Sequence, residues 1–340
     1  MRILLVGDYP DDPRLGSTKV YHKLRDEFRG LGHACDVLLS PELGARPAAA
    51  RLRWLVGPLL AERAIGRAFR ANGAYDVVDV ASAEGSVVGA RRKAGAYRGV
   101  ALVSRSHGLE HLNFRRMVDD HRAGLAPKPW HRRLWYPAAR MSQVALAARL
   151  ADRLLVLNDA DRDFALARGW KRPDAVDVVP HGVSQRFLDD APPDGAPRGA
   201  GLLFCGSWDP MKGVDYLVAA MTLLAGDRDP PRLTILGPGP PAEVVLAAFP
   251  ERVRPLVTVL PRTGEDDVMR RFREHDALLM TSSYEGFGMV VVEAMSQRLP
   301  VIATTMGCAP ALLSRGGGIL VPPRDPAAVA GAVRRLLGDA

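Results

Sequence analysis

The sequence has few of the features that would place the chain outside the ordinary globular class. It contains three cysteines, Cys35, Cys205 and Cys308, whose odd number and scattered spacing fit neither a disulfide framework nor a metal site. No apolar run approaches the ~20 residues that a membrane-spanning helix needs. The opening MRILLVGDYP has an apolar stretch too short for a secretory signal and predicts a buried strand instead. We therefore expect a globular protein of a reducing compartment, the cytoplasm.

The positive charge is distributed unevenly along the 340 residues. Residues 1–182 carry 30 Lys and Arg against 20 Asp and Glu, whereas the remainder carries 16 against 18. No RNP-type aromatics, zinc-finger spacing or Lys/Arg run indicates a nucleic-acid partner. An anionic membrane surface or an acidic acceptor explains the basic first half better, and a solvated Arg-rich surface is the alternative.

Three arginines make the membrane interpretation specific. Arg63, Arg67 and Arg70 share one face of a helix predicted over 51–71, and apolar residues precede them in the same segment. Gly57-Pro58 is expected to break that helix. Two interpretations are equally supported: a face that makes peripheral contact with an anionic membrane or lipid acceptor, and core residues beside a solvated arginine stripe.

Strand-like and helix-like segments alternate along the chain, which is typical of doubly wound parallel sheets. The first half predicts strands at 3–6, 34–39, 77–80, 101–104, 153–157 and 176–179, with helices at 17–31, 51–71, 86–94 and 159–168. The second half predicts strands at 202–205, 233–236, 257–260, 277–280, 301–303 and 319–321, with helices at 214–224, 266–273, 289–297 and 326–337. Between the halves, residues 184–200 are rich in Pro, Gly and Asp and predict a linker. We expect two α/β domains, 1–183 and 201–340.

The most informative stretch is 282–297, SSYEGFGMVVVEAMSQ, which lies between two apolar strands. The turn Gly286-Phe287-Gly288 precedes a predicted helix, so backbone amides lie at a helix N-terminus beside the carboxyl end of a strand. Glu285 and Glu293 flank the turn at a spacing of about 12 Å along a helix. A glycosidase acid/base pair lies closer, at roughly 5–9.5 Å. One long phosphate-bridged ligand such as a nucleotide sugar fits better, although the pair alone would more simply be a loop carboxylate and a solvated helix residue.

The stretch as a whole, EGFGMVVVEAM followed by LPVIATTMG, closely resembles the Glu-x7-Glu region of retaining GT-B glycosyltransferases, in particular family 4, the glycosyl transferases group 1. The resemblance is strong over 202–322 and weaker before. It implies the α/β GT-B fold, in which two Rossmann-like doubly wound domains face each other across a cleft. It further implies that Glu285 contacts the donor sugar, that the amides of Gly286, Phe287 and Gly288 lie by sugar and phosphate, and that Glu293 holds the ribose hydroxyls.

The same resemblance assigns roles in the first half. Gly16 stands where the family commonly has a glycine-rich turn against the donor diphosphate, although pattern alone favours a plain helix cap there. His107, in SRSHGLE after a predicted strand, matches a His-Gly-x-Glu-like segment that faces the donor sugar. Glu110 belongs to the same segment.

In the second half, LFCGSWDPMKG corresponds to a family segment whose Arg and Lys neutralise the donor diphosphate. Lys212 matches the Lys, and a lysine before Gly213 at a helix start suits a phosphate. Ser207 and Trp208 occupy the position of the Arg. The loss implies weaker donor binding, a substitute Arg, or lost activity.

Asp159-Ala160-Asp161 could suggest a metal-binding Asp-x-Asp, but it lies at a predicted helix start where Asn158 or Asp159 can accept from free amides. We expect helix capping, no essential metal and no cofactor beyond the donor substrate.

Taken together, the resemblance implies a retaining glycosyltransferase that moves a sugar from a UDP- or GDP-sugar to an unknown acceptor, lipid-linked or saccharide. His107, Lys212 and Glu285 are its expected catalytic residues, and the protein is a monomer or homodimer. A nucleotide-sugar 2-epimerase of the same fold, or a degenerate sugar-nucleotide-binding protein without turnover, are the alternatives. Since the helix predicted at 326–337 is the last, the linker alone is expected to join the halves as a loose hinge.

Overall fold

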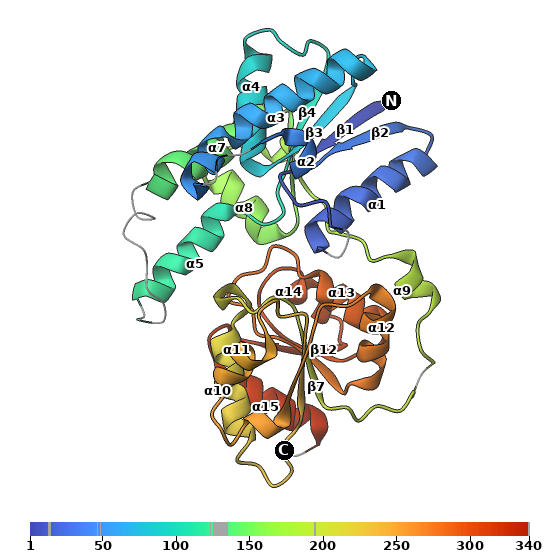
Figure 1. Cartoon of the computed structure of the whole chain (residues 1–340), viewed down its shortest axis with the longest axis vertical. Helices are drawn as coiled ribbons and strands as arrows, with labels where there is room; N and C mark the ends of the chain where they lie inside the picture. Colours follow the sequence, from blue (N-terminus) through green and yellow to red (C-terminus); the bar gives the residue numbers. More distant parts are fainter. Residues whose placement is uncertain are drawn as a thin grey trace. The chain divides into compact units, whose positions relative to one another are not determined.

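The structure is a computed structural model that describes residues 1–12, 15–45, 47, 49–122, 124, 135–193 and 195–338. The chain divides into two compact units, Met1–Pro180 and His181–Ala340. Each unit has its own six-stranded parallel sheet with helices packed on it (Figure 1). The predicted α/β class is thus confirmed, and the division falls three residues before the predicted boundary at 183.

The N-terminal unit has the sheet order β2-β1-β3-β4-β5-β6. Its strands are β1 (Arg2–Val6), β2 (Ala34–Leu38), β3 (Val77–Ala81), β4 (Ala101–Arg105), β5 (Arg153–Val156) and β6 (Val176–Val178). Its helices are α1 (Gly16–Gly30), α2 (Ser40–Leu43), α3 (Ala50–Asn72), α4 (Gly85–Lys93), α5 (Glu110–Arg122), α7 (Ser142–Leu150) and α8 (Asp159–Ala167). Because β1 and β3 are apolar on both faces, separate core clusters form on the two sides of the sheet.

Helix α3 corrects one prediction. It runs through Gly57-Pro58 without a break for 23 residues, and both residues are buried. A proline inside a helix removes one backbone hydrogen bond. The segment remains helical because it packs closely on the unit, where Gly57 lies beside Glu84 and α3 contacts α4.

The C-terminal unit has the sheet order β12-β11-β10-β7-β8-β9. Its strands are β7 (Leu202–Cys205), β8 (Leu233–Leu236), β9 (Val257–Leu260), β10 (Ala277–Met280), β11 (Val301–Thr304) and β12 (Gly318–Val321). Its helices are α9 (Gln185–Asp189), α10 (Val214–Leu224), α11 (Ala242–Ala247), α12 (Glu265–Glu274), α13 (Met289–Ser296), α14 (Ala309–Leu313) and α15 (Pro326–Leu337). Helix α9 lies inside the predicted linker, where Phe187 is fully buried and packs against Phe272.

Candidate functional site

Two of the residues predicted to bind the donor, Lys212 and Glu285, meet at the carboxyl edge of the C-terminal sheet. Lys212 ends the short helix η4 (Pro210–Lys212) after β7, and Glu285 lies in the loop after β10. The Lys212 Nζ atom is 2.6 Å from Glu285 Oε2, and Ser282 Oγ donates to the same oxygen at 3.2 Å. Both side chains of the ion pair are largely shielded, so the pair is a strong charge-assisted hydrogen bond.

A close backbone contact fixes where Lys212 stands. Gly213 has a φ of +68°, and a Cβ atom there would lie 1.9 Å from the carbonyl oxygen of Thr281. The Thr281 hydroxyl donates to the Lys212 carbonyl at 3.0 Å, and the Ser283 amide donates to the Met211 carbonyl at 2.9 Å. Only glycine fits this approach, so the turn carrying Lys212 is held against the loop carrying Glu285.

The predicted glycine turn, Gly286-Phe287-Gly288, is held by contacts with residues outside it. Gly288, with a φ of +95°, is the N-cap of α13. The Cys308 amide donates to the Phe287 carbonyl at 2.7 Å, and the Phe287 ring meets the His181 ring edge-on at 5.3 Å. Burial, together with the charge of Glu285, raises the pKa of the Cys308 thiol to about 12, so this thiol is protonated and acts as packing.

Glu293 lies in the second turn of α13 and is half-buried. Ser207 is exposed directly after β7, whereas Trp208 turns into the core, with its ring 6.2 Å from that of Phe204 and 5.9 Å from that of Phe249. Trp208 therefore serves packing, and Ser207 is the exposed one of the two residues that occupy the position where the resemblance implies an arginine.

One cation at this edge was missed by the sequence analysis. Arg262 follows β9, is exposed, and lies beside Gly237, whose Cβ position is 3.6 Å from the Arg262 Cα atom. The sequence signal that could have identified Arg262 is its position directly after Pro261, which follows an apolar strand. It is a candidate for the substitute arginine.

In the N-terminal unit, the rings of His107, Tyr9 and Tyr21 pack together in one cluster. The His107 ring centroid is 5.4 Å from that of Tyr9 and 5.5 Å from that of Tyr21, and its Nε2 atom is 3.3 Å from the Tyr21 hydroxyl. The loop beneath is tied by the Leu109 amide, which donates to Asp161 Oδ2 at 3.3 Å. Burial raises the pKa of Asp161 to about 7. His107 is thus held at the carboxyl edge of β4.

Glu110 has different partners. It begins α5 and is bonded to Arg140, to the Ser82 hydroxyl at 3.1 Å and to the Tyr136 hydroxyl at 3.3 Å. Arg140 also bonds Glu84, which is almost fully buried, and burial raises the pKa of Glu84. Arg140 and Glu84 were not predicted as site residues.

Gly16 is the first residue of α1 and is exposed, and a Cβ atom at this position would meet nothing within 4 Å. The structure therefore gives no steric reason for a glycine there. Asn158 caps α8 by accepting from the Asp161 amide at 2.9 Å, which confirms the predicted capping. Within the described ranges, no three His, Cys, Asp or Glu side chains are grouped to hold a metal ion, and no helix is long and apolar enough to cross a membrane.

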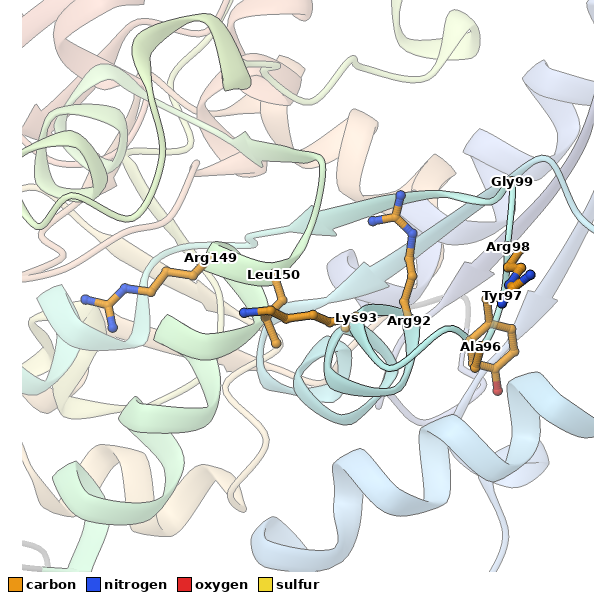
Figure 2. A pocket seen from close by; sticks show the side chains of 9 residues that line it. Arg92, Lys93, Ala96, Tyr97, Arg98, Gly99, Arg149 and Leu150 are labelled. Atoms are coloured by element: carbon orange, nitrogen blue, oxygen red, sulfur yellow. The ribbon is translucent and has the colours of Figure 1, made fainter.

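The basic character of the first half gathers at the amino ends of β4 and β5. A pocket of about 510 Å³ is lined there by Arg92, Lys93, Arg98 and Arg149, which lie in a row across Figure 2. Arg92 is paired with Asp152 at 2.9 Å, whereas the other three form no ion pair within the described part of the chain.

A second pocket, of about 530 Å³, adjoins the first and shares Tyr97 with it. Its cations are Arg63, Arg67 and Arg70 of α3 and Arg91, which pairs with Glu62 at 2.9 Å. We call the two pockets together the basic surface.

The same outward face of α3 is apolar one turn earlier. Leu52, Leu55 and Leu59 are 51%, 41% and 46% exposed, and helical spacing aligns them with the arginine stripe that follows. Leu146 on α7 is 43% exposed. Since α4 packs between α3 and α7, the three helices form one layer that carries both the leucines and the cations (Figure 1).

Comparison with known proteins agrees with the fold. Solved structures of GT-B glycosyltransferases share the fold of the chain. Sucrose-phosphate synthase from Thermosynechococcus elongatus matches 99% of the chain and 90% of its own at a TM-score of 0.78 and 19% identity. An Anabaena protein, HepE, solved in complex with UDP and glucose, matches all of the chain and 90% of its own at a TM-score of 0.64 and 19% identity.

Residues 199–339 match the family described as Glycosyl transferases group 1, so the C-terminal unit contains a domain of that family. A D-inositol 3-phosphate glycosyltransferase from Streptomyces scabiei is 33% identical over 71% of the chain. Another from Acidothermus cellulolyticus is 29% identical over 79% of it. The matched parts cover 55% and 61% of those relatives, so the chain spans little more than half their length.

Proposed function

We propose that the chain is a glycosyltransferase that takes a nucleoside-diphosphate sugar, of UDP or GDP type, as donor. The observation that carries the proposal is the Lys212–Glu285 pair beside the glycine turn and the N-terminus of α13. A lysine ammonium and helix N-terminal amides suit a diphosphate, and a carboxylate suits sugar hydroxyls. The family match of this unit and the names of the relatives support the same chemistry.

In this proposal Lys212 neutralises charge on the leaving nucleoside diphosphate, Glu285 and His107 hold the sugar, and Glu293 holds the ribose. Transfer with retention, assisted by the leaving phosphate, needs no side-chain nucleophile. The acceptor binds the N-terminal unit. The protein acts in the cytoplasm, without a metal ion.

The test is a thermal-shift panel of UDP-, GDP-, ADP- and CMP-sugars on the full chain, followed by sugar transfer in EDTA. Glu293→Ala should weaken binding of every nucleotide, whereas Glu285→Ala should not weaken binding of free nucleotide but should damage use of the nucleotide sugar. If the two variants bind free nucleotide alike, the division of roles is wrong. Conversion of a nucleotide sugar without any acceptor would favour the 2-epimerase.

A binding protein without turnover is the second candidate, because Trp208 is committed to the core where an arginine is expected. It would bind the donor and transfer nothing to any acceptor.

We also propose that the basic surface makes peripheral contact with anionic membranes. Cations beside exposed leucines on one helix layer suit the headgroup region of an anionic bilayer. Vesicles with and without anionic lipid give the test. Arg63/Arg67/Arg70→Glu should abolish salt-sensitive binding, whereas Arg172→Glu, exposed elsewhere in the unit, should not. Absence of vesicle binding at low salt would contradict this part.

A further inference from the structure

An ion triad, of which only Glu84 is fully buried, lies at the carboxyl edge of the N-terminal sheet. Glu84 follows β3, Glu110 follows β4, and Arg140 belongs to the short π-helix η2 (Pro137–Met141). The Arg140 Nη1 atom is 2.7 Å from Glu84 Oε1, and its Nη2 atom is 3.0 Å from Glu110 Oε1. Its Nε atom donates to Glu110 Oε2 at 3.1 Å, so every guanidinium nitrogen is bonded to a carboxylate.

The three side chains of this triad carry no net positive charge. With both glutamates ionised it sums to one negative charge, and with Glu84 protonated it sums to zero. Burial favours the protonated form of Glu84, but neither state leaves Arg140 unbalanced. The guanidinium is also 12% exposed, against 22% for the Glu110 side chain. A ligand arriving at this edge therefore meets a carboxylate before it meets the cation.

The neighbouring groups are also suited to hydroxyls. The Ser82 and Tyr136 hydroxyls both bond Glu110, and Asp8, which follows β1, accepts from the Ser40 hydroxyl at 2.9 Å. Among the described side chains, the first turns of α1 and α3 carry Lys19 and Arg53, and neither is without a partner. Carboxylates accept hydrogen bonds from sugar hydroxyl or amino groups and repel a phosphate, and the hydroxyls can add further bonds to a polyol.

We propose that the acceptor presents an unphosphorylated polyol or sugar to this triad, with hydroxyl or amino groups bonded to Glu110. The inference rests on the proposed glycosyltransferase function and specifies its acceptor. It separates this chain from relatives named for D-inositol 3-phosphate. Glu84 and Arg140 act as positioning residues, since Arg140 bonds Glu110 and Glu84 bonds Arg140.

The experiment compares matched acceptors with and without phosphate on the full chain: myo-inositol with D-inositol 3-phosphate, and glucose with glucose 6-phosphate. Binding is measured by ligand-observed NMR, and transfer is measured separately. We expect the wild type to bind the unphosphorylated member of a pair more tightly. Glu110→Gln should shift the affinity ratio about tenfold toward the phosphorylated member, which corresponds to about 1.4 kcal/mol.

Glu62→Gln is the matched control, because it neutralises another buried, paired carboxylate of the same unit, on α3. It should leave the ratio unchanged, and UDP or GDP binding should show that each variant is folded. Tighter binding of the phosphorylated members by the wild type, no binding of any member, or a ratio that Glu110→Gln does not move would overturn the proposal. The expected binding without sugar transfer would instead contradict the proposed function and leave the acceptor class standing.

Discussion

The ammonium group of Lys212 lies 2.6 Å from the carboxylate of Glu285, although the two residues are 73 positions apart. The cation expected at the donor phosphate is therefore balanced by a carboxylate before any ligand arrives. A diphosphate that binds here shares Lys212 with Glu285, so the carboxylate both orients the lysine and competes for it. The two residues act as a unit, so the effects of substituting each of them on nucleotide binding should not be additive.

This pair predicts opposite effects for its two members on binding of free UDP or GDP. Lys212→Ala should weaken the nucleoside diphosphate by roughly tenfold and the nucleoside little, because it removes one charge-assisted contact. Glu285→Gln should strengthen the diphosphate a few-fold at low salt, because it frees the lysine. Calorimetry on both variants measures the difference. Asp215→Asn, which removes an exposed carboxylate three residues from Lys212, is the control. Equal weakening by both changes would contradict the shared-lysine picture.

An arginine introduced at Ser207 should be tolerated by the fold, whereas one introduced at the adjacent Trp208 should not. Ser207→Arg places a guanidinium on an exposed position at the carboxyl edge and should tighten UDP or GDP binding without loss of stability. Trp208→Arg removes a ring packed against Phe204 and Phe249 and should lower the free energy of unfolding by roughly 2–4 kcal/mol. Denaturation and calorimetry on the pair check both expectations. Similar stability of the two variants would show that Trp208 is not needed for packing.

Gly213 and Gly16 make a second matched pair. Gly213→Ala places a Cβ atom 1.9 Å from the Thr281 carbonyl at a positive φ, so it should cost more than about 2 kcal/mol of unfolding free energy and weaken nucleotide binding. Gly16→Ala meets nothing within 4 Å and should be neutral or stabilising by up to about 1 kcal/mol. Urea denaturation in the presence and absence of UDP separates the two effects. A loss of nucleotide binding by Gly16→Ala would instead support the predicted role of that glycine.

Asp161 gives the stability a defined dependence on pH. Its folded-state pKa, raised by burial to about 7, means that the native state holds the proton more tightly than the unfolded chain. Its contribution to unfolding free energy is therefore greatest in acid, falls as pH rises to about 7, and is level above that.

Asp161→Asn lacks this titration but keeps an oxygen for the Leu109 amide. The stability of the variant relative to wild type should rise with pH by on the order of 1 kcal/mol per unit between about pH 4 and 7. Denaturation at pH 5, 7 and 8 measures the slope. Asp159→Asn, at a position that is 70% exposed in the same helical turn, is the control for the change of an aspartate to an asparagine. A flat difference for Asp161→Asn would mean that its carboxyl is hydrated.

The strands of both sheets could be predicted from the sequence because they are short, apolar and buried. The bounds of β7, β8, β9 and β10 agree with the prediction residue for residue, as do those of α10 and α15. The short helices α2, α11 and α14 were not predicted, because four to six residues do not show a helical period. The predicted helix break at Gly57-Pro58 was wrong because local helix propensity does not take the burial of that turn into account.

The candidate site was predictable only in part. Resemblance brought Lys212 and Glu285 into one site, but their mutual ion pair follows from the Gly213–Thr281 approach, which no spacing encodes. The inward turn of Trp208 likewise depends on Phe249, far along the chain. The triad of Glu84, Glu110 and Arg140 was missed because it depends on where the π-helical turn η2 places the Arg140 guanidinium.

The C-terminal unit completes both its sheet and its core from its own residues, with a cluster that extends from Leu202 to Val333. The family match, 199–339, covers nearly the same span. Genetic recombination between Pro180 and His181 would therefore transplant the whole C-terminal unit, including α9 and its buried Phe187, without dividing a sheet or a core. Under the proposed function, such an exchange would keep the donor site and replace the acceptor site, because the triad around Arg140 belongs to the N-terminal unit.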